Sequence, residues 1–371
     1  MSSVAGRVIE AHGTTLVVAD AFGTTRVELT EPSEASAGDL VVVRDGAVAE
    51  RFVAPPPRGD GETARFVFGG VGRRLQDRAR AFAAIREYFD GQGFVEVDTP
   101  VRLRTPGLDL HVEALHADGG YLSTSPEHHM KRLLAGGLPR IYQLAHVLRA
   151  GELGPIHEPE FTMLEWYRAF AGQAEVMADT EAVVTRVART IAGGTTLTLC
   201  DGRAVDVSPP YERLTVRDAF RRFANIDDAA VLPEPRYFEV FVGEVEPALA
   251  ELSHPVFVCD YPIRYASLSR PSPDDPSVAE RFELHLAGVE LCNGFGELTD
   301  AAEQRRRFER DQAERRERGQ PVYPIDERLL AALEEGMPPS GGNALGVDRL
   351  VSLACGLAEI AGVQAFPAEW L

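Results

Sequence analysis

The segment RFELHLAGVELCNGFGELTD, residues 281–300, has the pattern of two short β-strands joined at Ala287-Gly288. A two-residue connection favours a tight hairpin, so the segment predicts part of an antiparallel sheet. Four polar side chains of this hairpin can bind a ligand: Glu283, Glu290, Asn293 and Glu297. Their concentration in an otherwise sheet-like sequence suggests a site on the sheet.

The two glutamates nearest the turn suggest what such a site holds. In a two-residue hairpin, the sequence places Glu283 opposite Cys292 and Glu290 opposite His285. The two carboxylates are then diagonal neighbours on one face, roughly 7–8 Å apart at most. A pair of carboxylates that share a hard cation with phosphate oxygens is typical of magnesium-nucleotide chemistry. The alternative is a solvated acidic hairpin without a ligand.

Composition sets the general class of protein. With 371 residues and 44% hydrophobic content, the chain can bury one large core, or one core and a small appended domain. It has no apolar run of about 18 residues, and its N-terminus lacks the pattern of a secretory signal. We therefore expect a soluble cytoplasmic protein that does not bind membranes. The four cysteines are widely spaced without a C-x-x-C pair, which argues against a zinc site or a disulfide framework.

The chain is acidic, and the composition of its basic residues is unusual. The formal net charge is −19, and Lys131 is the only lysine, every other Lys/Arg position being arginine. A strongly acidic protein is not an obvious partner for polyanions, although a local basic patch can still bind them.

A cluster of proline and glycine at residues 54–63 divides the chain. Five short strand patterns precede it: GRVIEA, TTLVVADA, TTRVEL, DLVVVRD and AVAERFV. We expect a small all-β module at residues 1–57, a linker at 58–74 and a large domain at 75–371. The first 58 residues hold two phenylalanines as their only aromatics, and five arginines against eight acidic side chains. A nucleic-acid-binding β-barrel needs stacking aromatics and a basic groove, so this module is not expected to bind RNA.

A second strand pair is predicted from IYQLAHVLRA and EFTMLEWYRAF, which are joined by the loop 151–159. Arg149, at the end of the first strand, can bridge a phosphate and a carboxylate with its planar set of donors. The alternative is a surface arginine. On the second strand Glu165 shares a face with apolar neighbours and needs a partner.

A glycine-rich turn lies near the C-terminus. In GGNALGVDRLVSLACG, residues 341–356, glycines precede Asp348-Arg349 and an apolar helix. Glycines at such a turn let the backbone approach a nucleotide, and an arginine at the helix start can hold a phosphate. The alternative is a helix-capping ion pair between Arg349 and Asp348.

These segments, in this order, resemble the signature motifs of class II aminoacyl-tRNA synthetases, and most closely the lysyl branch. The wording TSPEHHMKRLL, PEFTMLEWYR, GFGELTDAAEQRRRFE and NALGVDRL resembles the elongation factor P β-lysine ligases, relatives that lack an anticodon-binding domain. The resemblance covers about residues 75–371. It implies an α+β fold, an antiparallel sheet flanked by helices, with the N-terminal module as an OB-like addition. The helix and strand of residues 74–100 resemble the dimerisation motif, so a homodimer is expected.

The resemblance also implies roles for individual residues. ATP would be bound by Arg149, Glu152, His157, Phe161, Glu283, Gly346 and Arg349, of which Arg149 and Arg349 would be catalytic. The amino acid would be bound by Ser125, Glu127, Tyr167, Asn293, Glu297 and Ala344. Magnesium would be bound by Glu283 and Glu290. Strict strand alternation puts Asn293 and Glu297 on the face opposite Glu290, so we expect a β-bulge at Gly294 or Gly296.

The chain departs from the family pattern in the loop 151–159. Gly151 and Ile156 stand where the family has a glutamate and an arginine near the nucleotide, and Glu152 can replace the glutamate if the loop shifts by one residue. Ala344 stands where tRNA-charging lysyl enzymes tend to have glycine. Such a methyl group biases substrate choice by only about 1–3 kcal/mol.

The resemblance implies an ATP- and magnesium-dependent ligase. It would activate lysine or β-lysine as an adenylate and transfer it to a lysine side chain of elongation factor P, with tRNA an unlikely acceptor. Two other hypotheses stay open. One is a lysine ligase that acts on tRNA or another carrier, and the other is a catalytically silent binding protein, which Gly151 and Ile156 motivate.

Overall fold

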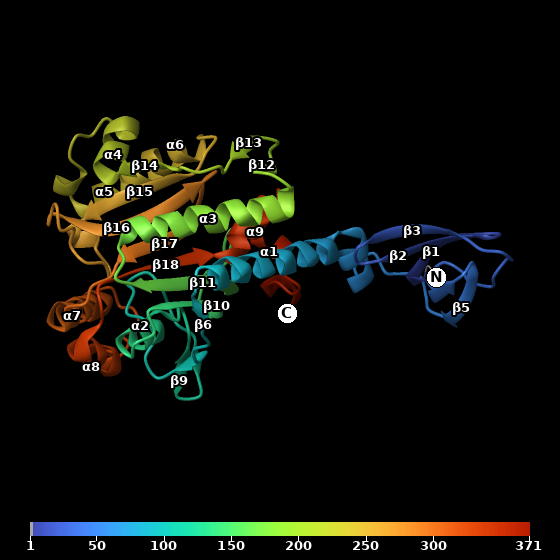
Figure 1. The fold of residues 1–371 in the computed structure, drawn as a ribbon, viewed down its shortest axis with the longest axis horizontal. Coiled ribbons are helices and arrows are strands. Elements are labelled where there is room, and N and C mark those ends of the chain that lie inside the picture. The colour runs from blue at the N-terminus through green and yellow to red at the C-terminus, as the bar shows by residue number, and fades with distance from the viewer. Residues whose placement is uncertain (1–2) are drawn as a thin grey trace. The chain divides into compact units, whose positions relative to one another are not determined.

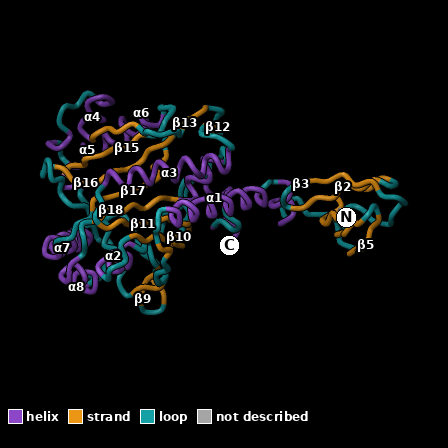
Figure 2. The backbone as a smooth tube through the Cα atoms, viewed as in Figure 1, coloured by secondary structure: helices purple, strands orange, loops and turns teal. Residues whose placement is uncertain are grey.

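The computed structural model describes residues 3–371, which form two compact units. One unit runs to Arg80 and includes Gly362–Phe366, and the other comprises Ala81–Ala361 and Pro367–Leu371. The boundary falls within helix α1 (Val71–Gly91). Figure 1 shows the elements of both units, and Figure 2 shows which parts of each are helix, strand and loop.

The first unit is built on a five-stranded antiparallel sheet in the order β3-β2-β1-β4-β5. Its strands are β1 (Ser3–His12), β2 (Thr15–Asp20), β3 (Gly23–Glu28), β4 (Leu40–Arg44) and β5 (Ala47–Phe52). Alternating side chains such as Val8, Leu16 and Val41 form its core. All five predicted strands are confirmed. No pairing joins β3 to β5 in residues 3–52, so the sheet is open there and the OB-like description stays a prediction.

The second unit contains an eight-stranded sheet in the order β14-β15-β16-β17-β18-β11-β10-β6. The strands are β6 (Val95–Glu96), β10 (Arg140–Leu148), β11 (Glu160–Ala169), β14 (Glu212–Thr215), β15 (Val256–Pro262), β16 (Val278–Leu286), β17 (Val289–Gly296) and β18 (Ser340–Gly346). Only the outermost pairs, β14 with β15 and β6 with β10, are parallel. The expected antiparallel sheet flanked by helices is confirmed.

Helices cover this sheet. Besides α1 they are α2 (Glu127–Ala135), α3 (Gln173–Ala192), α4 (Val216–Ala224), α5 (Glu234–Val240), α6 (Glu246–Ala250), α7 (Ala301–Glu317), α8 (Glu327–Gly336) and α9 (Val347–Ala354). In Figure 1, α3 lies along β16, β17 and β18, whereas α2, α7 and α8 gather beside one another. Apolar residues of α2, α7 and α8, among them Met130, Phe308 and Leu330, share one core with Tyr167 of β11.

Short elements complete the fold. Small sheets are formed by β7 (Arg102–Leu103), β8 (His116–Ala117) and β9 (Gly120–Leu122), and by β12 (Thr196–Thr198) and β13 (Ala204–Asp206). Single turns of helix are η1 (Ala64–Phe68), η2 (Ala229–Val231), η3 (Phe241–Val245), η4 (Ile263–Tyr265), η5 (Ile360–Val363) and η6 (Ala368–Trp370). No helix among the described residues is long and apolar enough to span a bilayer.

The sequence from Gly172 to about Arg222 has a mostly helical pattern, but the structure departs from this pattern in the middle part. Helix α3 ends at Gly193, which takes a left-handed conformation with φ of 78°. Strands β12, β13 and β14 follow before α4 begins. The β-branched run after Gly194, TTLT, favours strands, and it outweighs the helical pattern on either side.

A buried arginine of α7 fixes the loop 107–113 beside the sheet. The Arg315 side chain is fully buried, and its guanidinium donates to the carbonyl oxygens of Pro321 (2.7 Å), Val112 (3.1 Å) and Asp109. It also stacks 4.7 Å from the ring centre of Tyr323, whose hydroxyl accepts the Ala114 amide. One side chain thus satisfies backbone carbonyl groups of two segments.

Replacing Arg315 with methionine is expected to lower the free energy of unfolding by about 3 kcal/mol, because several carbonyl groups lose their donor. Urea unfolding followed by tryptophan fluorescence measures this change. The exposed Arg316 on the same helix provides the control, and Arg316→Met should stay within about 0.5 kcal/mol of the parent protein. Equal midpoints for both variants would contradict the anchoring role.

Candidate active site

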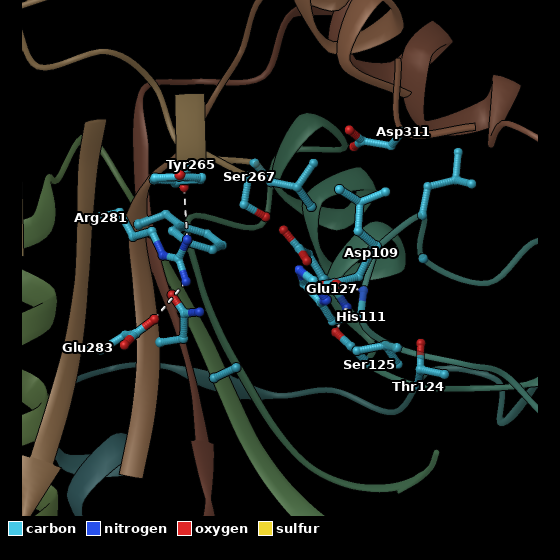
Figure 3. Close-up of a pocket in the computed structure, with 18 of the residues that line it drawn as sticks. Asp109, His111, Thr124, Ser125, Glu127, Tyr265, Ser267, Arg281, Glu283 and Asp311 are labelled. Carbon is cyan, nitrogen blue, oxygen red and sulfur yellow. Dashed lines mark hydrogen bonds and ion pairs between the residues drawn. The ribbon is translucent and has the colours of Figure 1, made fainter. Parts of the chain in front are cut away.

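The main cavity of the second unit has a volume of about 330 Å³ and opens over the face of the sheet. Its lining comes from β11, β16, β17 and β18, from the start of α2 and from the loop 107–112. Figure 3 shows Arg281 and Glu283 on one wall and Ser125 and Glu127 on the other. Charged groups from distant parts of the chain therefore share one enclosed space.

The predicted hairpin is confirmed, but one half of its predicted register was wrong. Glu290 lies opposite His285 as expected, whereas Glu283 pairs with Asn293 instead of Cys292. The register shifts between Leu284 and His285, which leaves Leu291 as the extra residue of a β-bulge in β17. A bulge of this kind cannot be inferred from strict alternation.

This bulge also corrects the expectation that Gly294 or Gly296 would re-aim the strand. Both glycines pair regularly with β18. They are needed for close approach, because a Cβ at Gly294 would clash with the Phe282 ring and one at Gly296 with Glu280. With the extra residue at Leu291, Glu290 and the distal polar residues of β17 fall on one face.

Glu283 lies in a dense set of donors. Its carboxylate is 2.6 Å from the Arg281 guanidinium, accepts the Tyr261 hydroxyl at 2.6 Å and lies 3.3 Å from His285. Burial would raise the pKa of Glu283, but Arg281 and the contacts with His285 and Tyr261 lower it to about 2. For Glu290, burial and the charge of Glu283 raise the pKa. A further positive charge between the two carboxylates would relieve that repulsion.

Arg149 reaches the cavity from the end of β10. Its guanidinium lies 5.3 Å from the centre of the Phe161 ring, and Nη1 is 3.7 Å from a Glu152 oxygen. Nε donates weakly to the Thr124 carbonyl at 3.4 Å. The guanidinium therefore packs over the Phe161 ring, and Arg149 lines the cavity. Arg149 is therefore part of the site wall and not an isolated surface residue.

Arg349 connects α9 with two other parts of the site. It donates to the carbonyl oxygens of Ile156 (3.1 Å) and Glu290 (2.8 Å), and Nη2 lies 2.8 Å from His157 Nε2. Burial and the Arg349 charge lower the pKa of His157, so the imidazole is neutral and can accept from the guanidinium. A Cβ at Gly346 would lie 3.3 Å from the Arg349 side chain.

The predicted ATP-binding residues do not all face one space. Arg149 and Glu283 line the main cavity, whereas Arg349 lines a second cavity of about 260 Å³ together with Ile156. The Glu290 carbonyl, bonded to Arg349, lies in the same hairpin as Glu283 and so links the two groups.

The opposite end of the main cavity is acidic. Ser125 donates to Glu165 at 2.5 Å and Tyr167 donates to the other Glu165 oxygen at 3.1 Å. Burial and the charge of Glu127 raise the pKa of Glu165 to about 8, although both hydrogen bonds oppose this. Ala344 of β18 lies opposite both Glu165 and Asn293 in the sheet. Thus the predicted amino-acid residues come together here.

Lys131 lies within this acidic group, and it was not among the predicted site residues. Its Nζ atom is 2.6 Å from Glu127 and 2.6 Å from Glu297. Burial raises the pKa of Glu297 to about 7 despite the opposing charge of Lys131. Two features of the sequence could have identified Lys131 as a site residue: it lies one helical turn after Glu127, and it is the only lysine of the chain. Glu165, noted as an acid without a partner, was also absent from the predicted set.

Comparison with known proteins agrees with this arrangement. The profile of the family "tRNA synthetases class II (D, K and N)" matches residues 65–369. The elongation factor P–(R)-β-lysine ligase of Edwardsiella ictaluri is 42% identical over 310 residues, 80% of this chain and 95% of that protein. The enzymes of the same name from Proteus mirabilis (41%, 79% and 94%) and Yersinia enterocolitica (39%, 82% and 98%) are similar. The chain therefore belongs to the class II tRNA synthetase family, within the group of elongation factor P β-lysine ligases.

Proposed function

We propose that this protein activates lysine or (R)-β-lysine with ATP and transfers the acyl group to a lysine side chain of elongation factor P. The observation that carries the proposal is that one cavity is lined by the carboxyl groups of Glu127, Glu165 and Glu297 and by the Arg149 guanidinium. A substrate with a distal ammonium and a carboxylate fits these opposite charges. The names of the relatives support the same activity.

The amino-acid end suits an ammonium because burying a positive charge is unfavourable unless carboxylates pair with it. Glu127 and Glu297 provide those carboxylates, while Glu165 is positioned by Ser125 and Tyr167 for a second amino group. Burial raises the pKa of Tyr167, so its hydroxyl stays protonated and donates to Glu165. The Asn293 side-chain oxygen has no hydrogen-bond partner within residues 3–371, so it can accept from the substrate.

In the first step the substrate carboxylate attacks the α-phosphorus of ATP in line, and pyrophosphate leaves. Arg149 would hold the reacting carboxylate, and Arg349 would hold the phosphates, while negative charge shifts. In the second step the acceptor amine attacks the acyl carbon and AMP leaves. No side chain of this protein needs to act as a covalent nucleophile.

Glu283 and Glu290 fit a magnesium ion shared with ATP. No cluster of three or more His, Cys, Asp or Glu suited to a metal occurs among residues 3–371. Magnesium bound by one or two carboxylates plus phosphate oxygens needs no such cluster, and the mutual repulsion of the two glutamates favours a cation between them. A magnesium ion there would neutralise charge on the phosphates.

The differences from the family pattern in the loop 151–159 bear on catalytic activity. Gly151 takes a left-handed conformation with φ of 76°, Glu152 lies beside Arg149, and Ile156 contributes its carbonyl oxygen to Arg349. Glu152 and the Ile156 backbone thus stay connected to the two arginines, which supports an active enzyme over a silent binding protein.

Other parts of the proposal rest on the family. We propose a cytoplasmic homodimer whose catalytic domain spans residues 75–371. The N-terminal sheet lies outside the residues 65–369 that match the family, and its few aromatics and acidic balance support an acceptor other than tRNA.

ATP–pyrophosphate exchange tests the activation step. With magnesium, we expect exchange with β-lysine or lysine above all other amino acids, and a loss of about 100-fold in Arg349→Ala, because a charge-stabilising contact is removed. Arg316→Ala, on the surface of α7, should keep the parent rate. Incubation with elongation factor P and mass spectrometry then identifies the acyl acceptor. Folded protein that exchanges with no amino acid would support the silent hypothesis, and transfer to tRNA would support the carrier hypothesis.

The pKa of Glu165 makes a separate prediction about pH. Only the ionised carboxylate binds an ammonium well, so the KM for the amino acid should fall as pH rises from 7 to 9 through a pKa of about 8. In Glu165→Gln the KM should be higher, and the part of this fall that is due to Glu165 should disappear. Steady-state exchange kinetics at matched ionic strength provide the measurement. A parent KM that rises over this range would refute the assignment.

A further inference from the structure

We infer that Lys131 is a positioning residue of the amino-acid site: its buried ammonium holds the carboxylates of Glu127 and Glu297 together for the substrate. Lys131 does not line the cavity, so it acts through these two glutamates. The inference rests on the proposed function for the identity of the substrate. The ion pairs themselves are independent of it.

The geometry of the three charges supports this role. Glu127 and Lys131 lie one turn apart on α2, whereas Glu297 directly follows β17, so the lysine connects a helix to the end of a strand. Both Nζ–carboxylate distances are 2.6 Å. The side chains of Lys131 and Glu297 are only 2% and 1% exposed, while Glu127 is 19% exposed. The ammonium is therefore behind the glutamates, and the glutamates face the cavity.

One oxygen of Glu297 is available to a ligand. Oε2 contacts Lys131, and Oε1 has no hydrogen-bond donor among the described residues. A Cβ at Gly342 would collide with this Oε1 and with the Tyr167 ring, so the glycine leaves the space beside the oxygen open. A buried carboxylate oxygen without a donor is unfavourable, and a substrate ammonium would supply the missing partner.

The choice of residue type adds to the argument. Every other Lys/Arg position in the chain is arginine, and lysine occurs only here. An ammonium is a compact point charge that can approach two carboxylates from different directions, whereas a guanidinium is a planar fork that favours one carboxylate in its plane. The site therefore uses the cation that can be shared between α2 and β17.

The charge balance explains why the lysine matters. The titratable groups around Lys131 are Glu127 of α2, Glu165 and Tyr167 of β11 and Glu297 after β17, with Arg270 contributing more weakly. Three carboxyl groups against one ammonium make this group negative once the carboxyls are ionised, which suits a cationic substrate. Without Lys131, burial and the charge of Glu127 would favour proton uptake by Glu297, whose pKa is already about 7.

The kinetic test compares Lys131→Met with Arg132→Met, which also removes a positive charge from α2. In Lys131→Met we expect the KM for β-lysine to rise about tenfold or more, with the KM for ATP within about twofold of the parent value. Raising the pH from 7 to 9 should restore part of the affinity by ionising Glu297. Lys131→Arg should lie between the variant and the parent, and Arg132→Met should resemble the parent. A folded Lys131→Met with the parent KM for β-lysine would overturn the inference.

A second measurement uses the unaltered protein. Labelling with lysine that carries ¹⁵N at Nζ gives a single side-chain resonance, because the chain has one lysine. We expect this ammonium to stay protonated well above the usual pKa of about 10.4, and its resonance to shift when β-lysine is added. β-Aminohexanoate, which lacks the distal ammonium, should leave it nearly unchanged.

The two measurements separate failure of this inference from failure of the proposed function. An Nζ that titrates like free lysine, or that ignores β-lysine in a protein shown to exchange with it, overturns the role of Lys131. If the parent protein shows no exchange with any amino acid while Nζ is protected, the proposed function fails and the ion-paired arrangement stands.

Discussion

Removal of carboxylates from water is the constraint on which the rest of the second unit depends. Glu165, Glu283 and Glu297 are almost inaccessible to solvent. A buried carboxylate is stable only with donors or opposite charge around it, so each one requires partners from elsewhere in the chain. Those partners come from three segments: Ser125 and Lys131 from α2 and the residues just before it, Tyr261 from β15 and Arg281 from β16. The arrangement of strands and helices around the cavity meets this electrostatic requirement.

Close packing explains why glycines occur in the middle of the sheet. Gly294, Gly296 and Gly342 lie in central strands, where glycine weakens a strand. A Cβ would strike Phe282 at Gly294, Glu280 at Gly296, and Tyr167 and Glu297 of the site at Gly342. The sheet therefore gives up intrinsic strand propensity to make room for Phe282, Tyr167 and the glutamates.

Local patterns predicted much of this structure, because strands, turns and long amphipathic helices depend on nearby residues. The hairpin at Ala287-Gly288 and the five N-terminal strands are examples. Two features were missed. The bulge at Leu291 breaks strict strand alternation, and alternation alone cannot reveal it. The strands after Gly194 form on a short β-branched run that lies between two helical patterns.

The residues of the candidate site also divide into those that the sequence predicted and those that it did not. Arg149, Glu127 and the hairpin glutamates were predicted as site residues from the positions of their charges in the sequence and from the family resemblance. Lys131 was noted only as a peculiarity of composition, because its significance depends on Glu297, which lies far away in the sequence. The separation of Arg349 from the main cavity was also beyond sequence reasoning, since it depends on how the loop 151–159 folds.

Burial of the only lysine has a practical consequence for work with this protein. A lysine-specific protease has a single cleavage point, which would yield residues 1–131 and 132–371. Because that bond lies within α2 and its side chain is held between two glutamates, cutting requires the helix to open. The rate at which the two fragments appear would therefore measure how often α2 unfolds, and no label has to be added.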